Sequence, residues 1–356
     1  MANYVIGSVF IVLIFLSRGF GSKNVLDVNV GPHTDENIMF HSNSALLEFY
    51  FYQAEYFLRL SDTSSYFTDI NFHTVDYFDN NHTSPVRNSA KNIFAGTRIS
   101  VLKSKMPNQV VSDSTLAKYI STSKKRISGG VATNFESNLL GLPVVGYPEL
   151  LLQSFFPSFD CMDLKEAGLD IKGLVAVVSM RNYEFNELLE LLYRLIVSNF
   201  DIFIFDVNTS EFTQLSRKIQ EKLTNEGKTT EMVQQLHYLD IRKTTLELLS
   251  TVYACSQVTI SNNVQSLLFA MAHHKPIVAI TDDTYDVENM IGLVDAPWLM
   301  IRKELAEVES IIEKMHSVLS SLPHIKQMCE NLVLMVSDLN HCMYLRAVYL
   351  DNVEGI

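Results

Sequence analysis

Short apolar segments that alternate with helical stretches constrain the fold of this chain more than any other feature of its sequence. Residues 173–179 and 201–206 are apolar almost throughout, as expected for strands of a parallel sheet that is covered on both faces. The stretch between them places leucine, phenylalanine and isoleucine at a spacing of three and four residues from Phe185 to Ile196, which gives a helix with one apolar stripe. Strands and helices that alternate in this way predict an α/β fold with parallel strands.

The same alternation extends over most of the chain. Further strands are predicted at residues 25–30, 92–97, 143–146, 235–239, 258–260 and 276–280, and helices at residues 38–60, 114–120, 210–225 and from 302 onward. Residues 61–90 are rich in Ser, Thr, Asn and Asp and are predicted to run over the surface. The pattern breaks near residues 157–170, where Pro157 and Ser158 interrupt it.

This pattern predicts two Rossmann-like domains, residues 22–160 and 161–302, which face each other across a cleft in a GT-B-like architecture. Helices over residues 303–356 would complete it at the C-terminus. In such sheets a ligand binds at the carboxyl ends of the strands, so residues that directly follow a strand are the first candidates for a site.

The charge of the chain excludes one large class of partner. The sequence holds 28 Lys and Arg against 40 Asp and Glu, a formal net charge of −12. Binding nucleic acid along its phosphates needs clustered positive charge, so no nucleic-acid partner is expected. A small anionic ligand remains possible, because one focused basic pocket can form inside an acidic protein.

The amino terminus begins with an apolar run over residues 4–16 that carries no charge. At about 13 residues it is shorter than the ~20 that a membrane-spanning helix needs, and it matches the hydrophobic region of a signal peptide. Cleavage would follow Gly21. Residues 1–21 are therefore predicted to be a signal peptide or membrane anchor, with secretion or membrane association through residues 4–16. Arg18 follows the run instead of preceding it, so a buried strand in a cytoplasmic protein is the alternative.

Sequons and cysteines bear on the same question. Two N-glycosylation sequons start at Asn81 and Asn208 and agree with secretion. The four cysteines, at 161, 255, 329 and 342, contain no C-x-x-C pair, and no metal site is expected. One disulfide is possible in an oxidising compartment, but buried free thiols are the favoured interpretation.

The second half of the chain resembles the polysaccharide pyruvyltransferase family. Ala254–Ser261, the helical residues 262–270 and Lys275–Thr281 resemble a strand, helix and strand of that family. Gly146–Leu152, Val177–Arg181 and Phe94–Thr97 resemble further segments in the same order, and the similarity covers about residues 23–293. The resemblance implies transfer of a pyruvyl group from phosphoenolpyruvate to a glycan sugar, with no cofactor.

The chain departs from the family at the positions that would carry this chemistry. Asn263, Val264 and Gln265 replace an Arg-Leu-His motif, and Tyr285 replaces a lysine. Phosphoenolpyruvate is strongly anionic and calls for Arg or Lys, and protonation of its vinyl carbon calls for a general acid. An amide such as that of Gln265 exchanges no proton usefully near neutral pH.

Candidate site residues follow from the resemblance and from strand-end positions. Gln265 and Arg181 are the candidate catalytic residues. The candidate ligand-binding residues are Asn263, Ser261, Asn262, Arg98, Gly96, Thr97 and Asp35. Purely structural roles compete with these assignments: an ion pair of Arg181 with Glu184, and helix capping by the Ser, Asn and Asp residues. The pair His273 and His274 is assigned to a helix end and not to a metal.

Three hypotheses for function remain open. The first is a pyruvyltransferase-like enzyme that uses phosphoenolpyruvate. The second is a GT-B glycosyltransferase with a nucleotide-sugar donor, in which Asn and Gln would recognise hydroxyl groups. The third is a catalytically inactive binding module of the pyruvyltransferase-like fold. A glycan acceptor is the expected partner of either enzyme.

Overall fold

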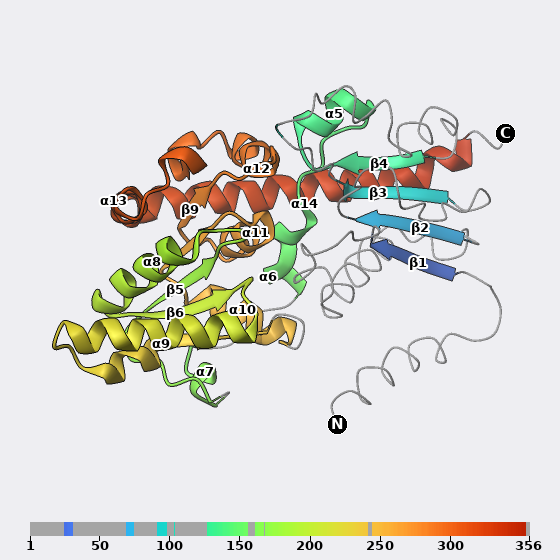
Figure 1. The fold of residues 1–356 in the computed structure, drawn as a ribbon. Helices are drawn as coiled ribbons and strands as arrows, with labels where there is room; N and C mark the ends of the chain where they lie inside the picture. Colours follow the sequence, from blue (N-terminus) through green and yellow to red (C-terminus); the bar gives the residue numbers. More distant parts are fainter. Residues whose placement is uncertain are drawn as a thin grey trace.

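The computed structural model describes residues 25–30, 69–74, 91–97, 103, 127–155, 161–166, 168–240 and 244–353. These residues form two parallel β-sheets with helices packed around them (Figure 1). The first sheet is built before residue 132 and the second after residue 173, and helices close the chain. This arrangement confirms the predicted α/β, GT-B-like fold class.

The second sheet has the strand order of a doubly wound Rossmann fold. Its order is β10-β9-β8-β5-β6-β7, with all neighbours parallel. The strands are β5 (Leu174–Ser179), β6 (Phe200–Phe205), β7 (Leu236–Tyr238), β8 (Val258–Ser261), β9 (Ile277–Ile280) and β10 (Met300–Ile301). If β5 to β10 are renumbered 1 to 6, the order read from the β7 edge is 3-2-1-4-5-6, which is that of a Rossmann fold. The topological switch point therefore lies between β5 and β8.

Helices of the second unit connect these strands. They are α8 (Phe185–Val197), α9 (Thr209–Asn225), α10 (Leu246–Cys255), α11 (Val264–Ala272), α12 (Asp286–Val294) and α13 (Val308–Leu319), with short 3-10 turns η2 (Thr230–Gln235), η3 (Pro297–Leu299) and η4 (Lys303–Leu305). On α8, Leu188, Leu192 and Ile196 are buried at the predicted spacing. All six residues of β6 are buried, so both faces of this strand are covered.

The first sheet consists of β1 (Val25–Val30), β2 (Asp69–Thr74), β3 (Lys91–Thr97) and β4 (Ile127–Val131), in that order and parallel. The predictions of β1 and β3 are confirmed. Strand β2 lies within residues 61–90, where no strand is predicted from the sequence. Ile70 and Phe72 alternate with polar residues there, and this period of two is easily hidden in a polar stretch.

Strand β4 was also missing from the sequence prediction, because its glycines give no apolar signal. At Gly130 a Cβ atom would lie 2.3 Å from Val145 Cγ1 and 2.7 Å from the Pro143 carbonyl oxygen. The neighbouring segment of the chain therefore leaves room only for a glycine at this position. That neighbour is the predicted strand over residues 143–146, which forms only a single bridge between Val144 and Val131.

The C-terminal helix α14 (Leu322–Val353) links the two units. It runs from the second unit back to the first sheet and packs against β4 and against η1 (Pro148–Leu151), which leads into α6 (Leu152–Phe155) (Figure 1). The buried side chain of Asn340 donates to the Val145 carbonyl oxygen at 3.0 Å. Helix α5 (Asn134–Leu140) follows β4 and contacts α12 of the second unit.

Gly146 lies where this helix approaches most closely, which leads to a first prediction. Its φ is +78°, and a Cβ atom would lie 2.5 Å from Val336 Cγ2, in a side chain that is itself fully buried. We expect Gly146→Ala to lower the free energy of unfolding by about 2–4 kcal/mol, from left-handed strain and overpacking. Urea unfolding measures this change.

Gly141 provides a matched control for that variant. Its φ is +68° but no atom lies within 4 Å of its would-be Cβ. Gly141→Ala therefore carries the conformational cost of about 1–2 kcal/mol without the clash. Equal losses in the two variants would contradict the close packing of α14 on Gly146.

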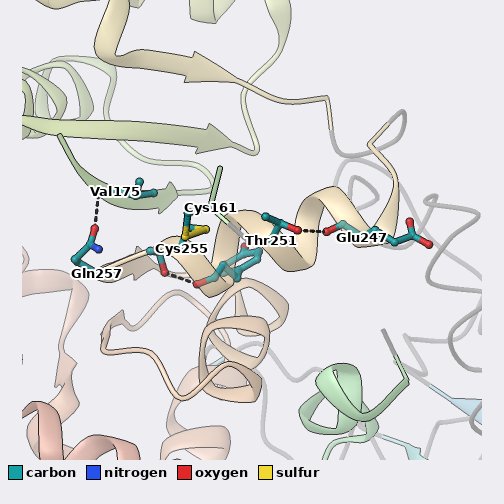
Figure 2. Close-up of a disulfide and its surroundings, with 8 residues drawn as sticks. Cys161, Val175, Glu247, Thr251, Cys255 and Gln257 are labelled. Carbon is teal, nitrogen blue, oxygen red and sulfur yellow. Dashed lines mark hydrogen bonds between the residues drawn. A yellow bond between two sulfur atoms is a disulfide. The ribbon is translucent and has the colours of Figure 1, made fainter. Parts of the chain in front are cut away.

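The structure corrects the interpretation of two cysteines. Cys161 and Cys255 form a disulfide with a Cα–Cα distance of 5.6 Å (Figure 2). Cys329 and Cys342 are free. The bond joins the turn before α7 (Asp163–Glu166) to the last residue of α10, across 94 positions of sequence. Free thiols were therefore the wrong expectation for this pair, since spacing along the chain does not reveal a contact made by folding.

Several sequence predictions lie outside the described residues. They concern the apolar run over residues 4–16, the helices at 38–60 and 114–120, and the sequon at Asn81. Within the part of the chain that the structure describes, no helix combines the length and the hydropathy that crossing a membrane requires.

Candidate functional site

The carboxyl ends of three neighbouring strands meet at the switch point of the second sheet. Ser179 ends β5 and is in register with Ser261, which ends β8. On its other side Ser179 is in register with Phe205, so Asp206 directly follows the end of β6. Ligands of doubly wound sheets bind in this position.

Asp206 forms the centre of a polar cluster at this edge. Its Oδ2 accepts hydrogen bonds from Asn263 Nδ2 at 2.9 Å and from the Ser179 hydroxyl. Its Oδ1 lies 3.5 Å from Arg181 Nε, and only 3% of the Asp206 side chain is exposed. The Asp206 carboxylate thus contacts one side chain at the end of β5, one in the turn after β5 and one in the turn after β8.

Asn262 fixes the turn that carries Arg181. The backbone N–H of Arg181 donates to Asn262 Oδ1 at 2.7 Å, and Asn262 Nδ2 donates to the Arg181 carbonyl oxygen at 2.8 Å. The oxygen and the nitrogen of the Asn262 amide therefore both join the turn after β8 to the turn after β5. Asn182, the next residue of the turn, has a φ of +48°, a conformation that asparagine tolerates better than most residues.

Ser261 and Asn263 shape the start of α11. The Asn263 N–H donates to Ser261 Oγ at 2.8 Å, and that hydroxyl donates to the Ser179 carbonyl oxygen at 2.7 Å. Asn263 Oδ1 then caps the helix by accepting from the Gln265 N–H at 3.1 Å. The asparagine has two roles, since its oxygen caps α11 while its nitrogen binds Asp206.

Two atoms of the cluster have unused hydrogen-bonding capacity. Arg181 Nη2 and Asp206 Oδ1 are buried, and neither makes a hydrogen bond within the described residues. A buried donor or acceptor left without a partner costs about 1–3 kcal/mol, so native proteins rarely retain one without a reason. One unsatisfied donor and one unsatisfied acceptor therefore belong to the Arg181–Asp206 ion pair at the carboxyl edge of the sheet.

The structure brings most of the predicted second-half residues to this one edge. Arg181, Ser261, Asn262 and Asn263 lie in the cluster, and Gln265 follows in the first turn of α11. Gln265 is only 1% exposed, so its side chain is enclosed by protein. The ion-pair partner of Arg181 is Asp206, and Glu184 instead occupies the N-cap position of α8.

Two of the predicted first-half residues, Gly96 and Thr97, are described by the structure and contact no residue of this cluster in it. Gly96 and Thr97 end β3, and Gly96 is buried with a φ of +67°. A Cβ atom on Gly96 would lie 2.5 Å from the Gly146 carbonyl oxygen and equally close to Pro148 Cδ, so close backbone packing explains this glycine. Arg98 and Asp35 lie outside the described residues.

Asp206 is the residue that the sequence analysis missed as part of the site. The available signal was its position, because it follows an apolar strand just as the Arg181 turn and the Ser261 turn do. Strand order was the missing information. Once β6 is known to lie next to β5, a carboxylate at its end must lie beside the Arg181 turn.

The loop between β9 and α12 contacts the first half of the chain. Tyr285, which stands where the resembled family has a lysine, occupies the N-cap position of α12 and stacks on Phe135 of α5 with ring centroids 6.3 Å apart. The Lys103 ammonium lies 2.8 Å from the carbonyl oxygen of Asp282 in this loop and 2.5 Å from Glu288 Oε1 in the first turn of α12. A lysine from the first half thus supplies positive charge near this loop.

His273 has a structural role at the end of α11. It is 5% exposed, and its Nε2 lies 2.9 Å from Ser250 Oγ. Burial lowers the pKa of His273 to about 4, so the ring is neutral at physiological pH. Within the described residues no group of three His, Cys, Asp or Glu side chains is placed to hold a metal ion.

No protein-family model and no curated protein matches the chain. Similar solved structures include an α,α-trehalose 6-phosphate synthase from Burkholderia multivorans, with 11% identity, 91% of this chain and 82% of that chain covered, and a TM-score of 0.45. A glycosyltransferase from Rickettsia africae is 12% identical, with 94% and 98% covered and a TM-score of 0.47.

A further similar structure is that of trehalose-6-phosphate from E. coli bound with UDP-2-fluoro glucose. It is 10% identical to this chain, with 93% of this chain and 92% of that chain covered and a TM-score of 0.49. With TM-scores below 0.5, these similarities carry no argument about activity. The resemblance to polysaccharide pyruvyltransferases stays a hypothesis.

Proposed function

We propose that this chain is a GT-B-type glycosyltransferase that binds a nucleotide-sugar donor at the Asp206 cluster and transfers the sugar to a glycan acceptor. The observation that carries the proposal is the buried pair of unused atoms, Arg181 Nη2 and Asp206 Oδ1, at the switch point of a Rossmann-type sheet. Doubly wound sheets bind nucleotides at this position.

The pairing of a donor with an acceptor favours a hydroxyl group as the bound chemistry. A hydroxyl both donates and accepts, so hydroxyl groups suit the donor Arg181 Nη2 and the acceptor Asp206 Oδ1 alike. A ribose or a hexose offers such groups. A phosphate or carboxylate only accepts, and Asp206 would repel it from the same place.

Charge distinguishes this donor from phosphoenolpyruvate. The guanidinium of Arg181 is already paired with Asp206, so the cluster presents no net positive charge. A small, strongly anionic substrate needs unpaired Arg or Lys, whereas a nucleotide sugar also offers neutral hydroxyl and base groups through which it can bind. Its diphosphate could approach the start of α11, where the helix dipole favours negative charge.

A ligand-binding experiment tests this proposal. UDP-glucose and GDP-mannose are compared with phosphoenolpyruvate by the shift that each causes in the melting temperature of the full chain. We expect a nucleotide sugar to stabilise the protein, by about 2.7 kcal/mol at a concentration of 100 Kd, and phosphoenolpyruvate to have no effect. The Arg181→Ala variant should lose the shift, while Arg194→Ala, an exposed arginine on α8, should keep it.

Each alternative gives a different result. A shift with phosphoenolpyruvate alone would favour the pyruvyltransferase hypothesis and overturn the proposal. Binding of a nucleotide sugar without release of the nucleoside diphosphate, across a panel of acceptor sugars, would indicate a binding module. Absence of any shift would remove the cluster as a donor site.

A further inference from the structure

We propose that Asn208 carries an N-linked glycan, attached at the N-terminus of α9. The site is independent of the proposed transferase activity. Asn208, Thr209 and Ser210 form a sequon, and the structure places both Asn208 and Ser210 on the exposed surface. A sequon on an exposed turn is the form of acceptor that glycosylation requires in a protein of the secretory pathway.

The hydrogen bonds of Asn208 leave the reactive nitrogen available. Asn208 Oδ1 accepts from the Glu211 N–H at 2.9 Å and from Ser210 Oγ at 2.5 Å, which makes it the N-cap of α9. Its Nδ2 donates no hydrogen bond to any described residue. A sugar on Nδ2 leaves the amide oxygen as an acceptor, so the modified residue can still cap the helix.

The disulfide supplies independent support for the compartment. A bond between Cys161 and Cys255 persists in oxidising surroundings such as the endoplasmic reticulum and is rare in the cytosol. N-linked glycans are added in the same compartment. One structural bond and one exposed sequon therefore point to the same route of synthesis.

Asn208 takes no part in the bonds of the Asp206 cluster. Asp206 lies two residues before Asn208, but its carboxylate binds Ser179, Arg181 and Asn263, and none of these bonds involves Asn208. The Asp206 side chain is buried, while Asn208 is exposed. The side chains of Asp206 and Asn208 therefore lie in separate environments near the end of β6.

The attachment is a group transfer from a lipid-pyrophosphate-linked oligosaccharide. Asn208 Nδ2 attacks C1 of the first sugar and loses one proton. The bond between C1 and the pyrophosphate oxygen breaks, and the lipid pyrophosphate leaves. A C–N bond forms, with no change of oxidation state, and the transferase of the secretory pathway supplies the catalysis.

The test uses the full chain with its own amino terminus, expressed in insect or human cells, with Asn81→Gln present to remove the other sequon. Electrophoresis before and after peptide-N-glycosidase treatment should show one glycan's shift in mobility. Asn208→Asp and Ser210→Ala should each abolish the shift, whereas Ser210→Thr should keep it. Asp is a good N-cap, so Asn208→Asp should fold with an unchanged melting temperature.

Three results would overturn the proposal. One is a protein whose mobility does not change on glycosidase treatment. Another is a glycan that survives in Ser210→Ala, which would place it at a different residue. The third is recovery of the chain from the cytosol with Cys161 and Cys255 both open to alkylation. Peptide mass spectrometry that finds the glycan on Asn208 would establish the site directly.

Discussion

Replacing Cys161 and Cys255 by alanine is expected to lower the free energy of unfolding by about 4–5 kcal/mol. The bond closes a loop across 94 positions, and the loss of chain entropy in the unfolded state grows with loop length. The disulfide also ties the segment between the two units to the end of α10, directly before β8. Urea unfolding followed by the fluorescence of Trp298, the single tryptophan, measures the change within the second unit.

Two controls separate the bond from the loss of the side chains. Reduction of the unaltered protein should cause the same destabilisation, while reduction of the double variant should have no further effect. Cys342 is free and exposed, so Cys342→Ala should change stability by less than about 0.5 kcal/mol. An unaltered protein as stable in reductant as without it would show that the bond contributes nothing.

Loss of the Asp206 carboxylate is the second large effect that we expect. Asp206→Ala removes the buried acceptor for Ser179 and Asn263 and the counter-charge of Arg181. Breaking a buried pair by removing one partner costs about 3–5 kcal/mol, and because 23% of the Arg181 side chain is exposed we expect the lower end of that range. The free energy of unfolding in urea is the quantity to measure.

Asp206→Asn tests the same site with less change of shape. Asparagine keeps one oxygen acceptor and tolerates the φ of +61° at this position, so its loss of stability should be smaller than that of alanine. The exposed pair of Arg194 with Glu309 is the control, and Glu309→Ala should cost less than about 1 kcal/mol. Equal costs for Asp206→Ala and Glu309→Ala would contradict a buried, organising role of Asp206.

The strands of the second sheet could be predicted because their signal is local. Residues 175–178 and 202–205 are apolar and buried throughout, as strands covered on both faces require. The first sheet lacks this signal at two places. Strand β2 carries Asp69, Asn71 and His73 between its apolar residues, and β4 contains two glycines, of which Gly130 is demanded by a close neighbour.

The candidate site could be predicted in part, for a related reason. Arg181, Ser261 and Asn263 each stand directly after or at the end of an apolar strand, and parallel strands bring such positions to one edge. Asp206 stands in an equivalent position, but its partners depend on which strand lies next to which. The pairing of Asp206 with Arg181 is a result of strand order.

The sequence by itself determined the α/β class, the parallel strands of the second half and the residues at their carboxyl ends. Periodicity and apolar runs encode these features over a few residues. The tertiary structure decided the partners: Asp206 for Arg181, Cys255 for Cys161 and Val336 for Gly146. Such pairs form between residues far apart in the chain, because the strand order and the return of α14 set their distances, and no local pattern records either.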